Sequence, residues 1–165
     1  MKYILFLPVL ILILNACSND EYQLEHMESR INDLEKKISD SYIPGFGEFM
    51  GNIQVHHAKL WFAGINDNWE LADFEVHEIK ETLEGLEKYQ SGRVETKSLP
   101  MIYPALDRVI VAIEKKDLKN FRNSYTTLTN ACNQCHQAVN YSFNNVKIPD
   151  RPPFGNQVFE IKSNK

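Results

Sequence analysis

The sequence predicts an all-α protein whose main body is an antiparallel four-helix bundle, and three observations support this. Between residues 44 and 140, four segments repeat apolar residues at the three- and four-residue spacing of amphipathic helices. The connections between them are short and polar, so consecutive helices are expected to pack side by side in opposite directions. No stretch shows the apolar–polar alternation that is typical of a strand.

Length and composition limit the kind of protein this can be. The chain has 165 residues, of which 43% are hydrophobic and 24% charged, which suits one domain with a buried core plus appendages. It is too polar for a protein that spans a membrane several times. A net charge of -4 argues against a nucleic-acid partner. No catalytic pair or substrate pocket is visible, so we do not expect an enzyme.

Residues 1–16 read as a signal peptide. Lys2 precedes an apolar run of about a dozen residues, which suits a signal-peptide core and is short for a membrane span. The run ends in Leu-Asn-Ala-Cys at 14–17, which resembles the bacterial lipobox and implies cleavage before Cys17 and a lipid on its sulfur. The alternative is a plain secretory signal with an incidental cysteine. We expect a lipid-anchored protein on the periplasmic side or at the outer membrane.

Residues 17–43 form a polar, lipidated spacer with one short helix. Its apolar residues follow the a/d pattern of a coiled coil over about two heptads: Leu24, Met27, Ile31, Leu34 and Ile38. Either a coiled coil that makes the protein a homo-oligomer or a lone amphipathic spacer helix fits this pattern, and we favour the spacer because the repeat is short. Pro44 and Gly45 then break the helix.

The first two bundle helices are predicted over about 45–63 and from 66–68 to Tyr89. Gly64 is expected to end the first helix, and the Asn-Asp-Asn sequence at 66–68 to cap the second. The predicted core stripes are Phe46, Met50, Ile53, His57 and Leu60 in the first, and Trp69, Ala72, Val76, Ile79, Leu83 and Leu86 in the second. Glutamates, Glu75 among them, crowd the remaining positions of the second helix.

A polar loop is expected at 90–98, followed by the last two helices. Pro100 opens the third helix, where Pro104 is tolerable in the first turn, and Asp117 caps the fourth. The stripe of the third is Ile102, Leu106, Val109 or Ile110, and Ile113. The stripe of the fourth is Leu118, Phe121, Tyr125, Leu128, Cys132, Cys135, His136 and Val139.

The fourth helix ends in the pattern Cys-x-x-Cys-His at residues 132–136. This pattern is the attachment signature of c-type haem, in which two thiols join the haem vinyl groups and the histidine binds the iron. Cysteines three positions apart on a helix project to nearly the same side, as a flat macrocycle requires. Alternatively, the two cysteines could form a redox-active dithiol or part of a metal site. A redox-active dithiol normally lies between a strand and a helix, and a zinc site needs a second pair of ligands, so neither alternative fits this sequence well.

A helical bundle with this motif late in its final helix resembles the class II c-type cytochromes, the cytochrome c prime family. The resemblance covers residues 45–140 and implies one covalent haem c per chain, with Cys132 and Cys135 as thioether attachments and His136 as the proximal iron ligand. Some members carry a methionine from the first helix as sixth ligand and transfer electrons to redox partner proteins. Others leave the distal face open and bind small gases such as NO and CO.

Topology restricts which side chain can reach the distal face. His136 lies near the end of the fourth helix, beside the beginning of the first helix and the beginning of the third. Met50 therefore has a suitable depth, and Met101 is the second candidate. His56 and His57 lie further along the first helix, and we expect His57 to be a hydrogen-bonded core histidine and His77 to be solvated. If a methionine is the sixth ligand, the protein is expected to be an electron carrier with His/Met ligation. If the distal face has no ligand, it is expected to be a five-coordinate gas-binding haem protein.

Arginines near the haem end are candidates to pair with the anionic haem propionates. Arg93 lies in the loop before the third helix, and Arg151 follows the last helix. By the same topology, four further residues should line the haem end: Tyr89, Met101, Ile102 and Tyr103.

Residues 141–165 form a tail that departs from the family pattern. Its prolines predict an extended chain, and its apolar content is too high for a fully disordered segment. We expect the tail to fold back over the haem end and to limit access to the haem.

Overall fold

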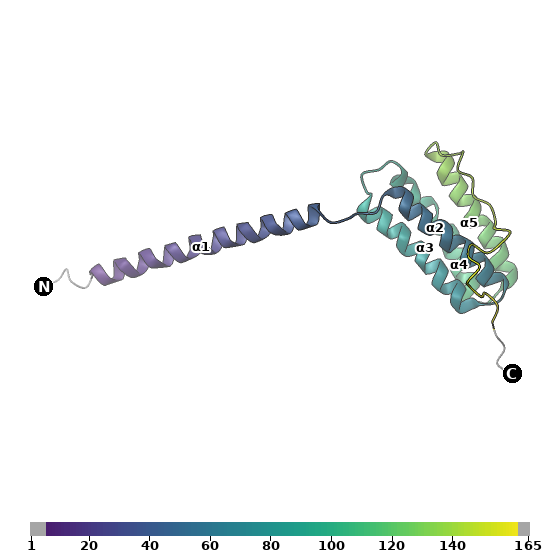
Figure 1. Cartoon of the computed structure of the whole chain (residues 1–165), viewed down its shortest axis with the longest axis horizontal. Helices are drawn as coiled ribbons and strands as arrows, with labels where there is room; N and C mark the ends of the chain where they lie inside the picture. Colours follow the sequence, from purple (N-terminus) through teal and green to yellow (C-terminus); the bar gives the residue numbers. More distant parts are fainter. Residues whose placement is uncertain (1–5, 162–165) are drawn as a thin grey trace. The chain divides into compact units, whose positions relative to one another are not determined.

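The computed structural model describes the backbone of residues 6–161 and the side chains of residues 21–161. Within this range the chain is all-helical, with six helices and no strands, so the all-α part of the predicted fold class is confirmed. The helices are α1 (Phe6–Ser39), α2 (Phe46–Ile65), α3 (Trp69–Tyr89), the 3-10 helix η1 (Glu95–Met101), α4 (Tyr103–Glu114) and α5 (Leu118–Ala138) (Figure 1).

The chain divides into two compact units, residues 1–43 and residues 44–165. In the first unit, α1 is one continuous helix that begins inside the predicted leader and runs through the predicted spacer. Cys17 falls within this helix, but its side chain lies outside the described part of the structure. Among the described residues, no helix combines the length and the apolar character needed to cross a membrane.

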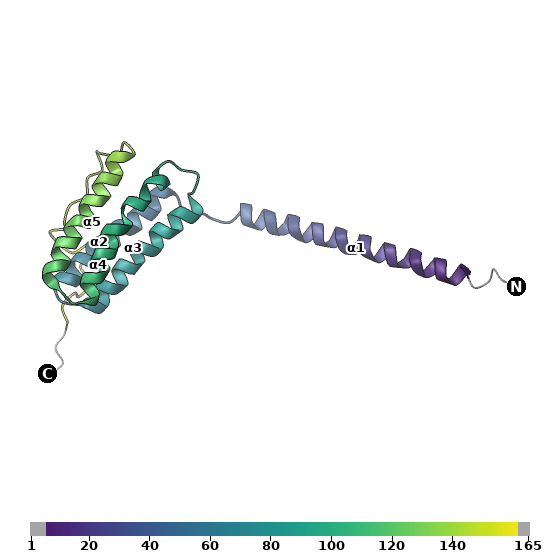
Figure 2. The ribbon, with the colours of Figure 1, turned by 180° about the vertical axis from the view of Figure 1, so that it is seen from behind.

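In the second unit, helices α2 to α5 pack on one another in the manner of a helical bundle (Figure 2). The most extensive packing is between α2 and α3 and between α4 and α5, and α3 also contacts α4 while α2 contacts α5. The core is drawn from all four helices, and its largest fully buried side chains include Leu60, Leu83, Leu106, Phe121, Tyr125 and Leu128. The predicted stripes include all six of these residues.

Three helices end by the same backbone device, in which the residue after the C-cap adopts a left-handed conformation. These residues are Asp67 (φ 56°), Lys116 (φ 52°) and Asn140 (φ 64°). In each case the next residue donates its N–H back across the last turn, as Tyr141 does to the carbonyl of His136 at 2.7 Å. The predicted N-caps are also in place, with Asn68 accepting from the Leu71 N–H and Asp117 from the Asn120 N–H. Each connection therefore reverses the chain within a few residues.

The expectation that Gly64 ends the first bundle helix is wrong. α2 continues past Gly64 to Ile65, and Gly64 is buried in its last turn. A Cβ atom at this position would lie within 2.1 to 2.7 Å of the Phe121 ring. The glycine is there because α2 and α5 approach closely, and the left-handed Asp67 ends the helix instead.

The predicted loop at 90–98 is also corrected at its end. The 3-10 helix η1 begins at Glu95, within that loop, and includes Pro100, whereas α4 begins only at Tyr103. Pro104 lies in the first turn of α4, as expected. Glu95 and Thr96 are buried in η1, so this connection is part of the packed domain.

Replacing Gly64 with alanine should destabilise the protein. The added methyl group overlaps a ring that cannot move without disturbing the core, which costs about 1–3 kcal/mol of unfolding free energy. Chemical denaturation measures this difference. Gly51→Ala is the matched control in the same helix, because its Cβ meets nothing within 4 Å and the change should stabilise α2 by about 0.5–1 kcal/mol. Equal effects of the two changes would contradict the packing described.

Candidate functional site

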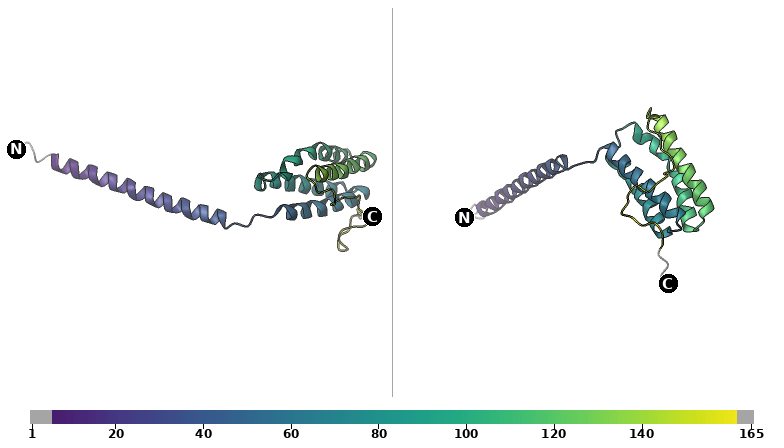
Figure 3. Two further views of the ribbon diagram at one scale, coloured as in Figure 1. Left: turned by 90° about the horizontal axis from the view of Figure 1, so that it is seen from above. Right: turned by 45° about the vertical axis from the view of Figure 1, so that its right-hand side comes forward.

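A pocket of about 850 Å³ lies between α2, α5 and the tail, which runs beside these helices in both views of Figure 3. The pocket collects most of the residues that the sequence singled out: Met50, Arg93, Cys132, Cys135, His136 and Arg151. Its volume is in the range typical of sites for cofactors and other small molecules. Side chains far apart in the sequence thus meet at one concave site.

The two cysteines lie one turn apart on α5, with Cys135 buried and Cys132 half-buried. Burial raises the pKa of Cys132 to about 12, and the nearby Cys135 adds to the shift. Burial also raises the pKa of Cys135. These thiols are therefore protonated at neutral pH, whereas redox-active dithiols depend on a lowered thiol pKa. The environment disfavours the dithiol alternative.

The His136 ring is oriented by the tail. Its Nδ1 atom lies 2.6 Å from the backbone carbonyl oxygen of Asn144. A carbonyl oxygen can only accept, so Nδ1 carries the hydrogen and donates it. In the neutral ring, Nε2 is then the atom with a free lone pair, which is the arrangement found in histidines that bind metals through Nε2.

Asn133, the first variable residue of the motif, holds the tail in place. Its amide Nδ2 donates to the Val146 carbonyl at 2.8 Å, and its Oδ1 accepts from the Val146 N–H at 2.7 Å. Both polar groups of one tail residue are thereby bound by one side chain. This role could not be predicted from the sequence, because an asparagine at this position is also common on the exposed surface of a helix.

Residues 141–161 contain no helix and run back along the bundle. Ile148 packs against the core, and Phe159 is buried with its ring centroid 5.6 Å from that of Phe62. Asn68 donates to the Phe159 carbonyl at 3.1 Å. The tail thus starts at the end of α5, lines the pocket between Tyr141 and Pro153, and is fixed again where α2 meets α3.

Met50 and Met101 differ in their positions. Met50 is half-buried on α2 and lines the pocket together with Gly47 and Gly51. Met101 is 41% exposed at the end of η1 and is not part of the pocket wall. Of the other residues predicted to lie near a haem, Ile102 lines the pocket, but Tyr89 and Tyr103 do not. Met50 therefore shares the pocket wall with the cysteines and His136, and Met101 does not.

Arg93 lines the pocket with its charge already paired. Its Nη2 donates to Oε1 of Glu95 at 2.7 Å and its Nε to Oε2 at 3.2 Å, and its guanidinium lies 5.2 Å from the Phe46 ring centroid. The hydrogen bonds from Arg93 lower the pKa of Glu95. Arg151 also lines the pocket and is exposed. Both arginines lie where an anionic group at the pocket rim could reach them.

His57 is a buried core histidine, as expected. The Tyr125 hydroxyl lies 2.9 Å from its Nδ1 and donates to its backbone carbonyl at 2.7 Å, and Nε2 lies 3.0 Å from the Thr129 hydroxyl. Burial lowers the pKa of His57 to about 4, so the ring is neutral at neutral pH. His77 is half-exposed and donates to the Asp73 carbonyl at 2.8 Å, which agrees with the expected solvated position.

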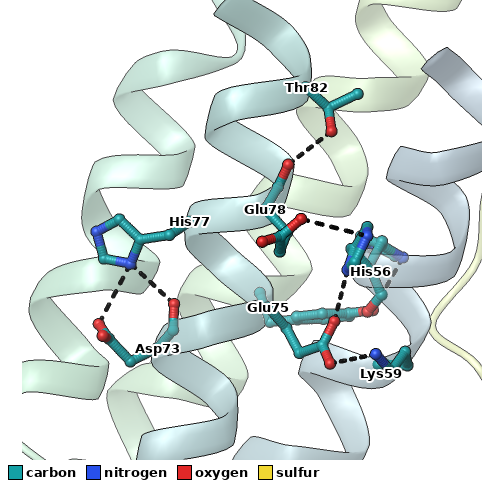
Figure 4. A network of polar contacts seen from close by, with 9 residues as sticks. His56, Lys59, Asp73, Glu75, His77, Glu78 and Thr82 are labelled. Carbon is teal, nitrogen blue, oxygen red and sulfur yellow. Dashed lines mark hydrogen bonds and ion pairs between the residues drawn. The ribbon is translucent and has the colours of Figure 1, made fainter.

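A charged network between α2 and α3, drawn in Figure 4, was not predicted from the sequence. Glu75 is fully buried, with Oε2 2.7 Å from Nδ1 of His56 and Oε1 2.5 Å from Nζ of Lys59. The Lys59 contact is an ion pair without hydrogen-bond geometry. Glu75 follows Ala72 by three residues and so lies at the edge of the core stripe. This spacing was the only feature of the sequence that could have indicated its burial. The network is outside the pocket wall.

Across the residues whose side chains are described, no group of three or more His, Cys, Asp or Glu residues is arranged to hold a metal ion.

His57 should make stability depend on pH. Its pKa is lowered in the folded protein, so as pH falls from about 6.5 to about 4 the unfolded state binds a proton that the folded state does not. The folded state should lose about 3 kcal/mol of unfolding free energy over this window. His57→Gln should lack this loss, while His77→Gln keeps it. Denaturation curves at several pH values measure it, and parallel curves for the wild type and His57→Gln would contradict it.

No protein family, curated protein or solved structure matches this chain in comparisons with known proteins.

Proposed function

We propose that this protein is an exported, membrane-anchored monohaem c-type cytochrome that transfers electrons, with His136 and Met50 as the axial ligands of the iron. The observation that carries the proposal is the meeting of Cys132, Cys135, His136 and Met50 at one pocket. Three of these residues come from the Cys-x-x-Cys-His motif on α5, and Met50 comes from a separate helix. We infer no enzymatic activity.

The residues present suit a covalent haem. The pocket has sufficient volume and many apolar lining residues, including Phe46, Ile53 and Leu128. Both thiols are free, as thioether formation requires. Arg93 and Arg151 lie where they could pair with the two propionates. A bound haem would supply one-electron redox chemistry at its iron, with the potential set by the axial ligands and by burial.

The protein's own residues would hold and shield this group. The Nδ1–H bond from His136 to Asn144 keeps Nε2 available as the proximal ligand. The sulfur of Met50 is a soft ligand that raises the potential of haem iron relative to a second histidine. Tail residues such as Val146 and Pro149 cover part of the pocket and exclude water from it.

Export agrees with this chemistry. The leader at residues 1–16 and the lipobox-like Cys17 support a lipid-anchored protein on the periplasmic side or at the outer membrane, with redox proteins as its partners. The mildly acidic net charge of -4 gives no support to nucleic-acid binding.

One observation favours a second candidate, a five-coordinate gas-binding haem protein for NO or CO. Gly47 and Gly51 flank Met50 on the pocket wall, and a Cβ atom at either position meets nothing within 4 Å. This helix surface leaves free space, which a small diatomic ligand could use if Met50 does not bind the iron.

Optical spectra distinguish the two candidates. The oxidised protein should show the weak red absorption band of methionine-ligated haem iron, and the reduced protein should be low-spin. Met50→Ala should abolish the band and open the iron to carbon monoxide, because alanine has no sulfur. Met101→Ala is the control and should leave the spectrum unchanged. A high-spin wild type that binds carbon monoxide at once would favour the gas-binding protein, and loss of the band in Met101→Ala would transfer the ligand role to Met101.

A further inference from the structure

We propose that Asn133 is a positioning residue that sets the orientation of His136 through the tail. This inference rests on the proposed function, in which His136 is the proximal ligand. Asn133 does not contact the His136 ring through any hydrogen bond of its own. It binds Val146. This contact fixes the backbone two residues earlier, where the Asn144 carbonyl accepts a hydrogen bond from Nδ1 of His136.

The contact between Asn133 and Val146 is bidentate. The 2.8 Å and 2.7 Å hydrogen bonds engage the carbonyl and the N–H of the same residue, so they set the direction of the tail backbone as well as its distance from α5. Both bonds lie in a partly buried site, where an unpaired donor or acceptor is unfavourable. Both variable positions of the motif could carry many residue types, and only a side-chain amide supplies a donor and an acceptor in this geometry.

The Asn144 carbonyl lies between two fixed points of the chain. On one side, the Tyr141 N–H donates to the carbonyl of His136 at 2.7 Å, and the Asn144 N–H donates to the Tyr141 carbonyl at 2.9 Å. On the other side, Val146 is held by Asn133. The segment from 141 to 146 therefore has little freedom, and its carbonyl at 144 presents a rigid acceptor to His136.

A fixed acceptor has a chemical consequence for the histidine. A hydrogen bond from Nδ1–H to a carbonyl makes the ring more electron-rich and Nε2 a stronger ligand, which favours the oxidised form of a bound iron. The same bond prevents the ring from rotating. Through its contact with the tail, Asn133 thus influences how strongly Nε2 of His136 can donate electrons to a bound iron.

The test compares Asn133→Ala with Gln134→Ala in the full-length haem-loaded protein. Gln134 is the other variable residue of the motif and is exposed, so it serves as the matched control. Hydrogen exchange at the Val146 amide should accelerate at least about tenfold in Asn133→Ala, because both hydrogen bonds are lost. The reduction potential of the haem iron should rise, since Nε2 of His136 becomes a weaker electron donor to the iron. Asn133→Asp keeps the acceptor for the Val146 N–H but loses the donor, and should give an intermediate exchange rate.

The outcomes separate this inference from the proposed function. The positioning role is overturned if hydrogen exchange at the Val146 amide is unchanged in Asn133→Ala, or if exchange is faster but the reduction potential is unchanged. Neither result affects the spectroscopic test of Met50 as an iron ligand. Exchange can be measured whether or not haem is attached. A chain without haem would therefore refute the proposed function while the contact between Asn133 and the tail is still tested.

A separate observation concerns α1, and we infer that it pairs with a second copy of this chain as a parallel two-stranded coiled coil. Its a/d residues are between 50% and 69% exposed: Leu24 62%, Met27 56%, Ile31 50%, Leu34 53% and Ile38 69%. Such a stripe on an otherwise polar helix suits the seam of a coiled coil. Ile31 and Ile38 occupy a positions and Leu34 a d position, the combination that favours parallel dimers.

The charges beside the stripe select the same orientation. Arg30 and Lys37 occupy g positions, and Glu28 and Glu35 occupy e positions. In a parallel pair, Arg30 of one copy faces Glu35 of the other, which is attractive. In an antiparallel pair, g faces g and e faces e, so like charges meet along the whole seam. Charge complementarity therefore identifies a second, parallel copy as the partner.

The seam is short, so its stability depends on local concentration. About two heptads are marginal for separate chains in water. Two chains anchored in one membrane through Cys17 would be confined and aligned in parallel, and this would raise their effective concentration. The proposed lipid anchor at Cys17 and the coiled coil thus support each other.

Disulfide cross-linking in membranes of cells that make the full-length protein tests this pairing. Ile31→Cys at an a position should give covalent dimers on oxidation with diamide, whereas Ser29→Cys on the outer face should give few. Arg30→Glu should reduce the dimer yield, and the double change Arg30→Glu with Glu35→Arg should restore it, because the swapped charges again attract. Equal yields from Ile31→Cys and Ser29→Cys, or no restoration by the double change, would overturn the inference.

Discussion

The structure of residues 44–161 depends on the packing of one face of α5. Phe121, Tyr125 and Leu128 are almost completely buried, and they fix this helix against α2 and α4. The cysteine and histidine positions continue the same face one to two turns later. Because a helix is rigid over this length, burial of the aromatic residues also determines where the motif points. The core and the candidate site therefore share one element.

Buried polar groups add specificity to this packing. His57 meets Tyr125 and Thr129 on α5, and Glu75 meets His56 and Lys59 across the contact between α2 and α3. Apolar stripes alone permit small shifts of one helix along another, but a buried hydrogen bond or ion pair is satisfied at one register only. α2 is held in this way from both sides. Its register in turn determines the depth at which Met50 enters the pocket.

Much of the fold could be predicted because local patterns express it directly. The amphipathic periods gave all four bundle helices, and Asn68 and Asp117 were recognisable as caps. The positions that were mispredicted depend on neighbours distant in sequence. Gly64 reads as a helix end, yet it faces Phe121, and Glu75 reads as a surface residue, yet its partners lie on another helix. Neither residue carries a local sign of its partner.

The helical composition, the Cys-x-x-Cys-His motif and the list of candidate site residues could be read from the sequence, because periodicity and residue spacing are properties of a single segment. Which of the candidate residues share one pocket depends on the tertiary structure. It brings Met50 to the pocket, leaves Met101 outside, and uses Asn133 to fix the tail beneath His136. These outcomes depend on helix register and on the path of residues 141–161, and both result from packing between segments that lie far apart in the chain.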